Sequence, residues 1–444
     1  MAKKILMICY YYPPITDVGS KRSVAFSKYL KRFGWDPYVV SVKNPDKNYC
    51  LVGAEPPSAE IPVTYTYSLF SLSALSGKVN GFLIRVAKLF GKKLKTNYFY
   101  QFICIPDIFW GWIPLTVLKS ARLIHQLCVD LIYVSCTPYT SAVIGLILKK
   151  ITGRPLVVDF RDQRGIGAEL EIEKFEVRLR RKIEKRFIQK VLQGADLFVV
   201  TSEEISRLYK TFFPQYAYKM ATIYNGFDSE YIEPSRKLTK FGLFTIIYTG
   251  SFYLYAIHSM AFFEALQILK ESKALTAETF QFLYYGDDYN KIQSCAEQYR
   301  IADLVKVHPR VPYTYVLQQL QQSHLQLIRI VKPMISTKVF EGISMDIPFL
   351  ATIPPGEVEE MIHKFSPSSI VITEDSGIRV SEAIMDAWRS YKNGKIQPNR
   401  VGEFLAFYSR ETQTRRLMAA IEGILSSAVE HSDSKNLARG SINL

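Results

Sequence analysis

The chain has 444 residues, of which 48% are hydrophobic and 22% charged, and this composition excludes a largely disordered protein. Its formal net charge is +15, and the excess lies in residues 1–228, where 33 Lys and Arg stand against 18 Asp and Glu, while the remainder holds 23 of each. Six cysteines without a CxxC pair or a histidine at ligand spacing argue against a zinc site or a disulfide framework and fit a reducing compartment.

The first half of the chain alternates between strand and helix patterns. The apolar run at 4–9 predicts a strand, a loop with Gly19 follows, and residues 20–33 have the apolar spacing of a helix. The same order recurs, with strands predicted at 37–42, 130–135, 155–160 and 195–201 and helices at 141–150 and 169–193. Strands that are apolar on both faces predict a parallel sheet covered by helices, in a domain that spans residues 1–228.

Within this domain, residues 65–118 form a predicted basic, amphipathic insert. The segment Lys78–Lys95 contains no acid, and its apolar residues fall on one helical face: Val79, Phe82, Leu83, Val86, Leu89 and Phe90. This pattern predicts a helix that lies on an anionic membrane surface, although a core-facing helix with a solvated basic face is the alternative. Residues 98–118 are aromatic but contain Asp107 and two prolines, so we expect no membrane span there. A second basic helix around 178–186 could extend the surface.

The second half repeats the pattern after a polar stretch at 229–242, which we expect to be a linker. Strands are predicted at 244–250, 280–286, 304–309, 325–330 and 348–353, in a domain that spans residues 243–409. No strand is predicted between 353 and 410; a terminal helix at 410–425 is expected to pack back toward the first domain, and 426–444 to be a flexible tail. The predicted fold class is α/β, with two Rossmann-like doubly wound parallel-sheet domains facing an interdomain cleft.

Loops at the carboxyl ends of the predicted strands are where ligands should bind. Gly19 would let the backbone approach a ligand, and Arg22 in the first helical turn would favour an anionic one, although a simple helix-start glycine is the alternative. Asp159, Arg161 and Asp162 end an apolar strand, so an Asp there could bind an acceptor hydroxyl or act as a catalytic base. An ion pair within the domain that fixes the loop is the alternative.

The segment 329–342 (RIVKPMISTKVFEG) gives the most informative predicted binding site. A strand ends in a basic loop, and a capped helix follows. The groups predicted to hold a diphosphate are Arg329, Lys332, Ser336, Thr337 and Lys338. Glu341 lies three residues after Lys338 on the same helical face and would accept hydrogen bonds from ribose hydroxyls. The alternative is a capped amphipathic helix with an exposed Lys–Glu pair.

Several segments resemble, in order along nearly the whole chain, those of family-four glycosyltransferases that assemble bacterial surface polysaccharides: YYYPPITDVGSKR, PLVVDFRDQ, ADLFVVTSEE, YNGFD, YTGSFY and STKVFEGISMDIPFLA. The resemblance implies a nucleotide-diphosphate-sugar donor, retention of anomeric configuration, and no requirement for a metal or other cofactor. It adds Gly250 and Ser251 of YTGSFY to the donor site. It also makes Glu341 the second acid of the family's E-x7-E motif, which holds the donor ribose, while Pro333 stands where the first acid is expected.

The predicted function is transfer of a sugar from a nucleotide-sugar to a lipid-linked or glycan acceptor, in surface polysaccharide biosynthesis on the cytoplasmic face of the membrane. One alternative is a nucleotide-sugar 2-epimerase of the same fold. Another is a non-catalytic scaffold of a glycan-assembly complex, which Pro333 motivates. Nucleic-acid binding is disfavoured because no recognised module appears and the bases cluster with apolar residues.

Overall fold

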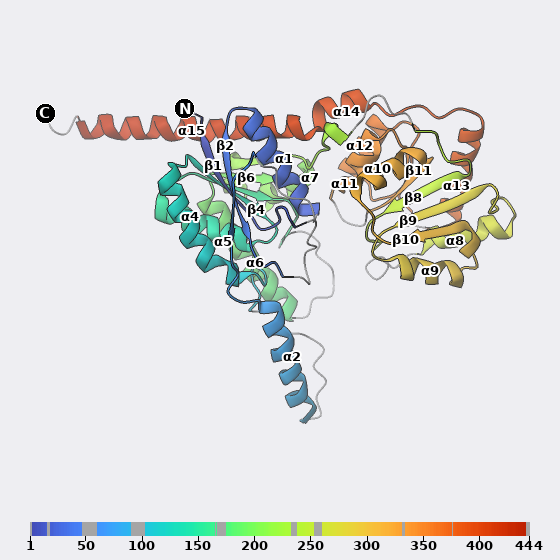
Figure 1. The fold of residues 1–444 in the computed structure, drawn as a ribbon, viewed down its shortest axis with the longest axis horizontal. Helices are drawn as coiled ribbons and strands as arrows, with labels where there is room; N and C mark the ends of the chain where they lie inside the picture. Colours follow the sequence, from blue (N-terminus) through green and yellow to red (C-terminus); the bar gives the residue numbers. More distant parts are fainter. Residues whose placement is uncertain are drawn as a thin grey trace. The chain divides into compact units, whose positions relative to one another are not determined.

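The computed structural model describes residues 2–15, 18–46, 60–89, 103–164, 166, 175–231, 238–252, 260–330, 334–374 and 376–440. The chain divides into two compact units, residues 1–225 with 410–444 (unit 1) and residues 226–409 (unit 2). Each unit is built on one parallel sheet with helices packed on it (Figure 1).

The sheet of unit 1 has the strand order β3-β2-β1-β4-β5-β6-β7, and all of its pairs are parallel. Its strands are β1 (Lys4–Cys9), β2 (Asp36–Val42), β3 (Val63–Thr66), β4 (Leu131–Cys136), β5 (Leu156–Phe160), β6 (Leu197–Val200) and β7 (Met220–Thr222). The chain winds outward in one direction from β1 and in the other from β4. The pair β1–β4 is therefore the topological switch point of the sheet, outside whose carboxyl ends ligands bind in such folds.

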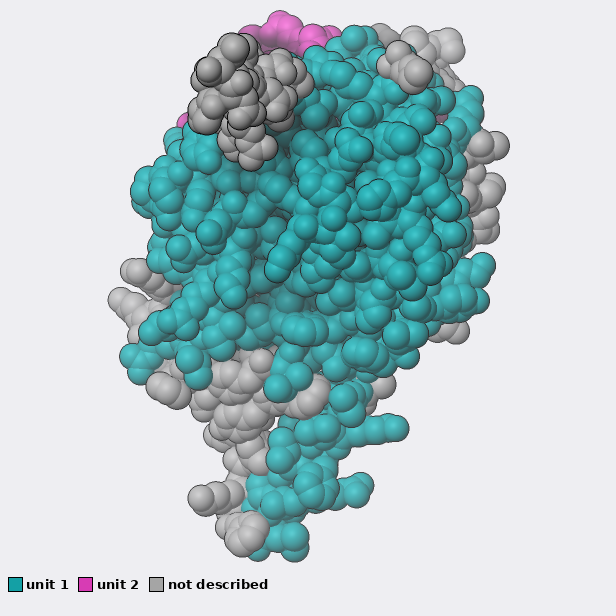
Figure 2. Space-filling view, turned by 90° about the vertical axis from the view of Figure 1, so that its left-hand side faces the viewer, with its two compact units in different colours: residues 1–225, 410–444 teal, residues 226–409 magenta. Residues whose placement is uncertain are grey.

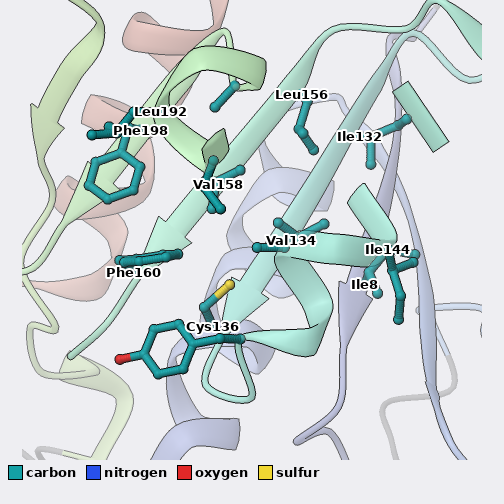
Figure 3. Packing of buried hydrophobic residues seen from close by; sticks show 14 of the residues in the cluster. Ile8, Ile132, Val134, Cys136, Ile144, Leu156, Val158, Phe160, Leu192 and Phe198 are labelled. Atoms are coloured by element: carbon teal, nitrogen blue, oxygen red, sulfur yellow. The ribbon is translucent and has the colours of Figure 1, made fainter. Parts of the chain in front are cut away.

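Helices cover both faces of this sheet, which explains why its central strands are largely apolar on both faces. The helices are α1 (Val18–Arg32), α2 (Leu72–Leu89), α4 (Ile113–Leu127), α5 (Thr140–Thr152), α6 (Phe175–Gly194), α7 (Glu203–Phe212) and α15 (Arg410–Gly440). One face buries Ile8, Val134 and Phe160 in a core cluster (Figure 3). The other face packs against α15, whose Leu417 and Ile421 are fully buried.

The sheet of unit 2 has the order β10-β9-β8-β11-β12-β13, again parallel throughout. Its strands are β8 (Phe244–Thr249), β9 (Phe280–Tyr285), β10 (Val305–His308), β11 (Leu325–Arg329), β12 (Phe349–Thr352) and β13 (Ile370–Ile372). Its helices are α8 (Ala261–Glu271), α9 (Tyr289–Gln298), α10 (Tyr313–Gln322), α11 (Thr337–Ser344), α12 (Glu357–Phe365), α13 (Gly377–Lys392) and α14 (Val401–Tyr408). Here the switch point lies between β8 and β11.

The predicted fold class of two Rossmann-like parallel-sheet domains is confirmed. The expectation that residues 353–410 contain no strand is wrong, because β13 adds three residues to the edge of the sheet beside β12. A strand of this length has no periodicity that could be recognised in sequence. The terminal helix α15 continues to Gly440, past residue 425 where the sequence pattern ended. Among the described helices, none has the length and apolar character needed to cross a membrane.

Candidate functional site

The carboxyl edge of the unit 1 sheet brings Arg22 and Asp159 together in a buried ion pair. The Asp159 carboxylate accepts hydrogen bonds from Arg22 Nε at 2.7 Å and Nη2 at 3.2 Å, and the Tyr133 hydroxyl also donates to it. Arg22 Nη1 donates to the Tyr224 carbonyl at 2.7 Å. The exposed fractions are 3% for Arg22 and zero for Asp159, so these two side chains fix the loops around α1 and β5. This arrangement favours a positioning role over the ligand contacts that the sequence suggested.

Arg161 lies two residues further along and next to the start of α1. Its guanidinium donates to the carbonyls of Cys136, which ends β4, at 3.1 Å and of Thr137, which follows the strand, at 2.6 Å. Gly19 packs directly against it, because a Cβ on Gly19 would lie 2.1 Å from Arg161 Nη1. A partly exposed guanidinium and the first amides of α1 therefore meet at the switch point between β1 and β4.

Asp162 stands beside this cluster and is exposed. Its carboxylate accepts a hydrogen bond from the Thr137 hydroxyl at 3.1 Å, and its carbonyl accepts one from the Tyr139 hydroxyl at the same distance. Of the three acids and bases predicted at the end of β5, Arg161 and Asp162 remain accessible to a ligand, whereas Asp159 is covered.

In unit 2 the loop after β8 lies beside the helix that follows β11. Gly250 has a φ of +87°, a conformation that suits glycine, and its carbonyl accepts from the Tyr284 hydroxyl at 2.8 Å. A Cβ on Gly250 would lie 3.6 Å from Lys338 Cε, so the lysine side chain passes over this glycine. The Ser251 carbonyl accepts from the Tyr248 hydroxyl at 2.9 Å, which holds the loop against its own strand.

The start of α11 carries the predicted anion-binding groups. The Ser336 hydroxyl accepts from the Lys338 amide and caps the helix, and Thr337 is its first residue. Lys338 Nζ lies 3.9 Å from the centroid of the Tyr248 ring. Burial lowers the pKa of this amine to about 8, against the opposing effect of Glu341. Desolvation thus destabilises the charged amine relative to the neutral one, and a bound anionic ligand would stabilise the charged amine again.

Glu341 lies one turn further along α11, with 6% of its surface exposed. Its carboxylate accepts a hydrogen bond from the Tyr313 hydroxyl at 2.8 Å. Tyr313 in turn packs edge-on against Tyr231, with the ring centroids 5.3 Å apart. Tyr313 therefore holds one oxygen of Glu341 in place. Sequence analysis missed this residue, because no sequence pattern links it to a glutamate in another helix.

Two further bases were predicted for this site. Arg329 ends β11, and its guanidinium carbon lies 5.1 Å from the Phe252 ring centroid, beside the loop after β8. Lys332 lies outside the described residues, as do Pro333 and Phe90. Gly250, Ser251, Arg329, Lys338 and Glu341 therefore gather around the β8–β11 switch point. Among the residues that the structure describes, no group of three or more His, Cys, Asp and Glu side chains could hold a metal.

The helix α2 projects from the body of unit 1 (Figures 1 and 2). Several of its apolar side chains are exposed. Leu75, Phe82 and Leu89, spaced by seven residues, are 45%, 65% and 84% exposed. Leu69, Phe70 and Trp110 add apolar surface at its base, where the Leu69 amide donates to the Gly111 carbonyl. We call the following residues the docking surface: Leu69, Phe70, Leu75, Phe82, Leu89 and Trp110.

Exposed bases lie on α2 itself, and further exposed bases lie on α6. Lys78, Arg85 and Lys88 are exposed on α2, which has no acid. On α6, Arg180 is paired with Glu184, and the exposed bases are Arg178, Lys182, Lys185, Arg186 and Lys190. Both helices therefore present positive charge to solvent.

Comparison with known proteins agrees with this architecture. Residues 21–231 match the model of Glycosyltransferase Family 4. The fold is similar to Anabaena Alr3699/HepE in complex with UDP-glucose, with a TM-score of 0.60 and 15% identity over 95% of this chain and 99% of that one. It is also similar to sucrose-phosphate synthase from Thermosynechococcus elongatus, with a TM-score of 0.58 and 12% identity over 98% and 100% of the two chains.

A third similar structure is a Listeria monocytogenes protein described as a UDP-N-acetylglucosamine 2-epimerase, with a TM-score of 0.56 and 11% identity over 96% of this chain and 98% of that one. At these identities the likeness concerns the fold. No curated protein matches the chain by sequence.

Proposed function

We propose, on the premise that residues 21–231 belong to glycosyltransferase family 4, that this chain transfers a sugar from a nucleotide-sugar to an acceptor, with unit 2 holding the donor and unit 1 the acceptor. The observation that carries the proposal is the group around the β8–β11 switch point. A capped helix start, a desolvated lysine and a glutamate one turn later match the order of phosphate and ribose in a nucleoside diphosphate.

The donor would bind with its diphosphate at the first turn of α11. The amide of Thr337 and the amine of Lys338 would supply hydrogen bonds and positive charge, while Gly250 lets the loop after β8 come close. Arg329 and Lys332 would add charge, and the backbone at Ser251 would add hydrogen bonds. Glu341, held by Tyr313, would accept hydrogen bonds from ribose hydroxyls.

Diphosphate binding by amides and bases leaves no step for which a metal is needed. We therefore propose a metal-independent transfer, with retention of anomeric configuration, which the resemblance to family-four glycosyltransferases implies. Activity should persist when EDTA is added, and loss of activity that Mg²⁺ or Mn²⁺ restores would contradict this part of the proposal.

A thermal-shift screen of nucleoside diphosphates tests the donor site. One nucleotide should raise the melting temperature of the wild-type protein, and Glu341→Ala should remove most of that shift. Glu382→Ala is the matched control, because Glu382 is 54% exposed on α13 and pairs only with the neighbouring Arg379 among the described residues. If no nucleoside diphosphate stabilises the wild type, the proposed function fails.

The acceptor would bind at the carboxyl edge of the unit 1 sheet. Arg161 and the start of α1 at Gly19 offer an anion site, and Asp162 offers an accessible carboxylate. The buried pair of Arg22 and Asp159 would hold these loops in register. Asp162→Asn is expected to lower transfer to the acceptor while nucleotide binding in unit 2 is kept.

We also propose that unit 1 attaches to an anionic membrane surface through the docking surface, and that the acceptor is lipid-linked. Exposed apolar patches on soluble domains mark interaction sites, and α2 carries exposed bases as well as exposed apolar residues. Each base near an anionic bilayer contributes about 1 kcal/mol, so the three on α2 alone would give reversible attachment. We further propose a location on the cytoplasmic face of the membrane and a role in surface polysaccharide synthesis.

Liposome flotation tests the membrane proposal. The wild type should float with vesicles that contain anionic lipid and float weakly with neutral vesicles, and Phe82→Glu should abolish flotation. Ile151→Glu is the matched control, since Ile151 is 57% exposed at the opposite edge of the unit 1 sheet. Equal flotation of Phe82→Glu and wild type would contradict the proposal.

The second candidate function is that of a nucleotide-sugar 2-epimerase, because the similar Listeria structure is described as such an enzyme. An epimerase changes the donor alone and needs neither a docking surface nor an acceptor site. Incubation of the nucleotide-sugar with the protein and no acceptor separates the two: an epimerised product indicates the second candidate. A scaffold would bind no nucleotide in the screen.

A further inference from the structure

A cavity of about 320 Å³ opens in unit 1 at the carboxyl ends of β1, β2 and β3, next to the start of α2. Its wall includes Tyr10 after β1, Asn44 and Asp46 after β2, residues 68–71 after β3, and Ser73 of α2. This volume is at the lower end of the range for small-molecule pockets, so it suits a ligand of one or two rings.

Hydrogen bonds hold the polar part of the wall in a fixed arrangement. The hydroxyls of Ser71 and Ser73 both donate to the Asp46 carboxylate, and the Asp46 amide donates to the Tyr10 hydroxyl at 3.1 Å. The Asn44 side chain accepts from the Ser68 amide at 2.7 Å and donates to its carbonyl at 3.0 Å. The loops after β2 and β3 are therefore tied to each other before any ligand arrives.

The charge of the cavity indicates the kind of ligand. Of the described lining residues, Asp46 is the charged one, and none is basic. A serine hydroxyl that donates to a carboxylate keeps lone pairs that can accept, so the wall is rich in acceptors. Such a wall disfavours phosphate and favours a neutral molecule with several hydroxyl donors.

Aromatic rings supply the apolar part of the cavity. Tyr10 and Phe109 pack with their centroids 4.6 Å apart, and Phe70 is 51% exposed at the rim. A ring with hydroxyls at its edge and C–H groups on its face can pack on these aromatics and still reach Asp46. Sugars have this amphipathic form, whereas fully polar or fully apolar ligands would leave one part of the wall unmatched.

The cavity also adjoins the docking surface, because Leu69 and Phe70 belong to both. A sugar bound there would lie at the base of α2. If α2 rests on a bilayer, a lipid attached to that sugar can stay in the membrane while the sugar enters the cavity.

We infer that this cavity binds a sugar of the lipid-linked acceptor, with Asp46 accepting hydrogen bonds from its hydroxyls and Phe70 packing on its ring. The inference rests on the proposed function, since it names the acceptor's binding group in a glycosyl transfer. Asp46 acts here as a binding and positioning residue.

The test uses the full chain and a panel of octyl glycosides below their micelle concentrations: glucoside, galactoside, mannoside and N-acetylglucosaminide. Saturation-transfer NMR should show saturable binding of at least one member. Asp46→Asn and Phe70→Ala should each weaken it about tenfold. Asp36→Asn, at the opposite end of β2 in an exposed pair with Lys31, is the matched control and should bind as the wild type does.

Nucleoside diphosphate shifts are measured on the same proteins. If these shifts are present in the wild type and both variants, the fold and the donor site are intact. Glycoside binding that is absent in the wild type, or equal in wild type and Asp46→Asn, then overturns the inference alone. Stronger binding of tetramethylammonium than of every glycoside also overturns it, because the cavity would then be a cation site. If the wild type shows no shift with any nucleoside diphosphate, the proposed function is overturned instead.

Discussion

The ionisation of Lys338 gives a direct test of the donor site. Its amine lies 3.9 Å from the Tyr248 ring centroid, and burial lowers its pKa to about 8 while the Glu341 carboxylate opposes the change. A lysine with a lowered pKa loses its charge as the pH rises through that value. Because a diphosphate is bound by the charged amine, nucleotide affinity should fall within an accessible pH range.

The size of the effect follows from the pKa. The fraction of protonated Lys338 falls from about nine-tenths at pH 7 to about one-tenth at pH 9, so the dissociation constant should rise roughly tenfold between these values. A bound diphosphate raises the pKa again, so proton uptake should accompany binding at pH 8 to 9. Titration calorimetry in two buffers of different ionisation enthalpy measures both quantities.

Lys338→Arg is the matched control, because a guanidinium stays charged over this range. Its affinity should be independent of pH between 7 and 9, and any titration of the nucleotide itself would appear equally in both proteins. Glu341→Gln should shift the wild-type profile to lower pH, since the opposing carboxylate charge is gone. A wild-type profile that is flat, or identical to that of Lys338→Arg, would refute the assignment of Lys338 to the diphosphate.

Further outcomes can be measured on the same protein. Burial lowers the pKa of His324 to about 4. The folded state therefore favours the neutral imidazole, and about 3 kcal/mol of stability present above pH 6.5 is lost as the pH falls to 4. Urea unfolding of unit 2, followed by hydrogen exchange of residues 244–249, should depend less on pH in His324→Asn than in the wild type. Tyr313→Phe removes one hydrogen bond to Glu341 and should raise the donor KM about tenfold at unchanged melting temperature. Gly19→Ala would place a methyl group against the Arg161 guanidinium and should lower transfer with little loss of stability, as steady-state kinetics and thermal melting can show.

Much of the fold could be predicted because its strands are covered on both faces. Runs such as 156–158 and 246–248 are apolar without alternation, and that signal survives in a single sequence. The strand β13 was missed because its three residues pair with β12 only in the folded sheet. Its formation depends on the strand beside it and not on its own sequence.

The sequence predicted where the candidate site residues lie along the strands and helices, but not which of these residues contact one another. Strand ends and helix starts located Arg22, Asp159 and Lys338 correctly at the carboxyl edges of the two sheets. Sequence could not reveal that Arg22 and Asp159 bind each other, because 137 residues separate them and both signs of charge suit a ligand site equally well. Tyr313 could not be predicted either, because its partner Glu341 lies 28 residues away and a tyrosine at a helix start does not indicate a binding role by itself.

The two switch points differ in how their charges are balanced, and this difference supports the proposed placement of the two ligands. In unit 1 Arg22, the fifth residue of α1, is neutralised by a fully buried carboxylate, and none of the described residues that line the cavity after β1, β2 and β3 is basic. In unit 2 Lys338, in the first turn of α11, is buried against an aromatic ring. Burial destabilises the charged form of its amine and lowers its pKa. A diphosphate would stabilise that charged form, whereas it would meet a carboxylate in the cavity of unit 1. The charge balance therefore supports the proposed division, with the nucleotide in unit 2 and a neutral, hydroxyl-rich group in the cavity of unit 1, while Arg161 keeps the proposed anion site at the β1–β4 switch point.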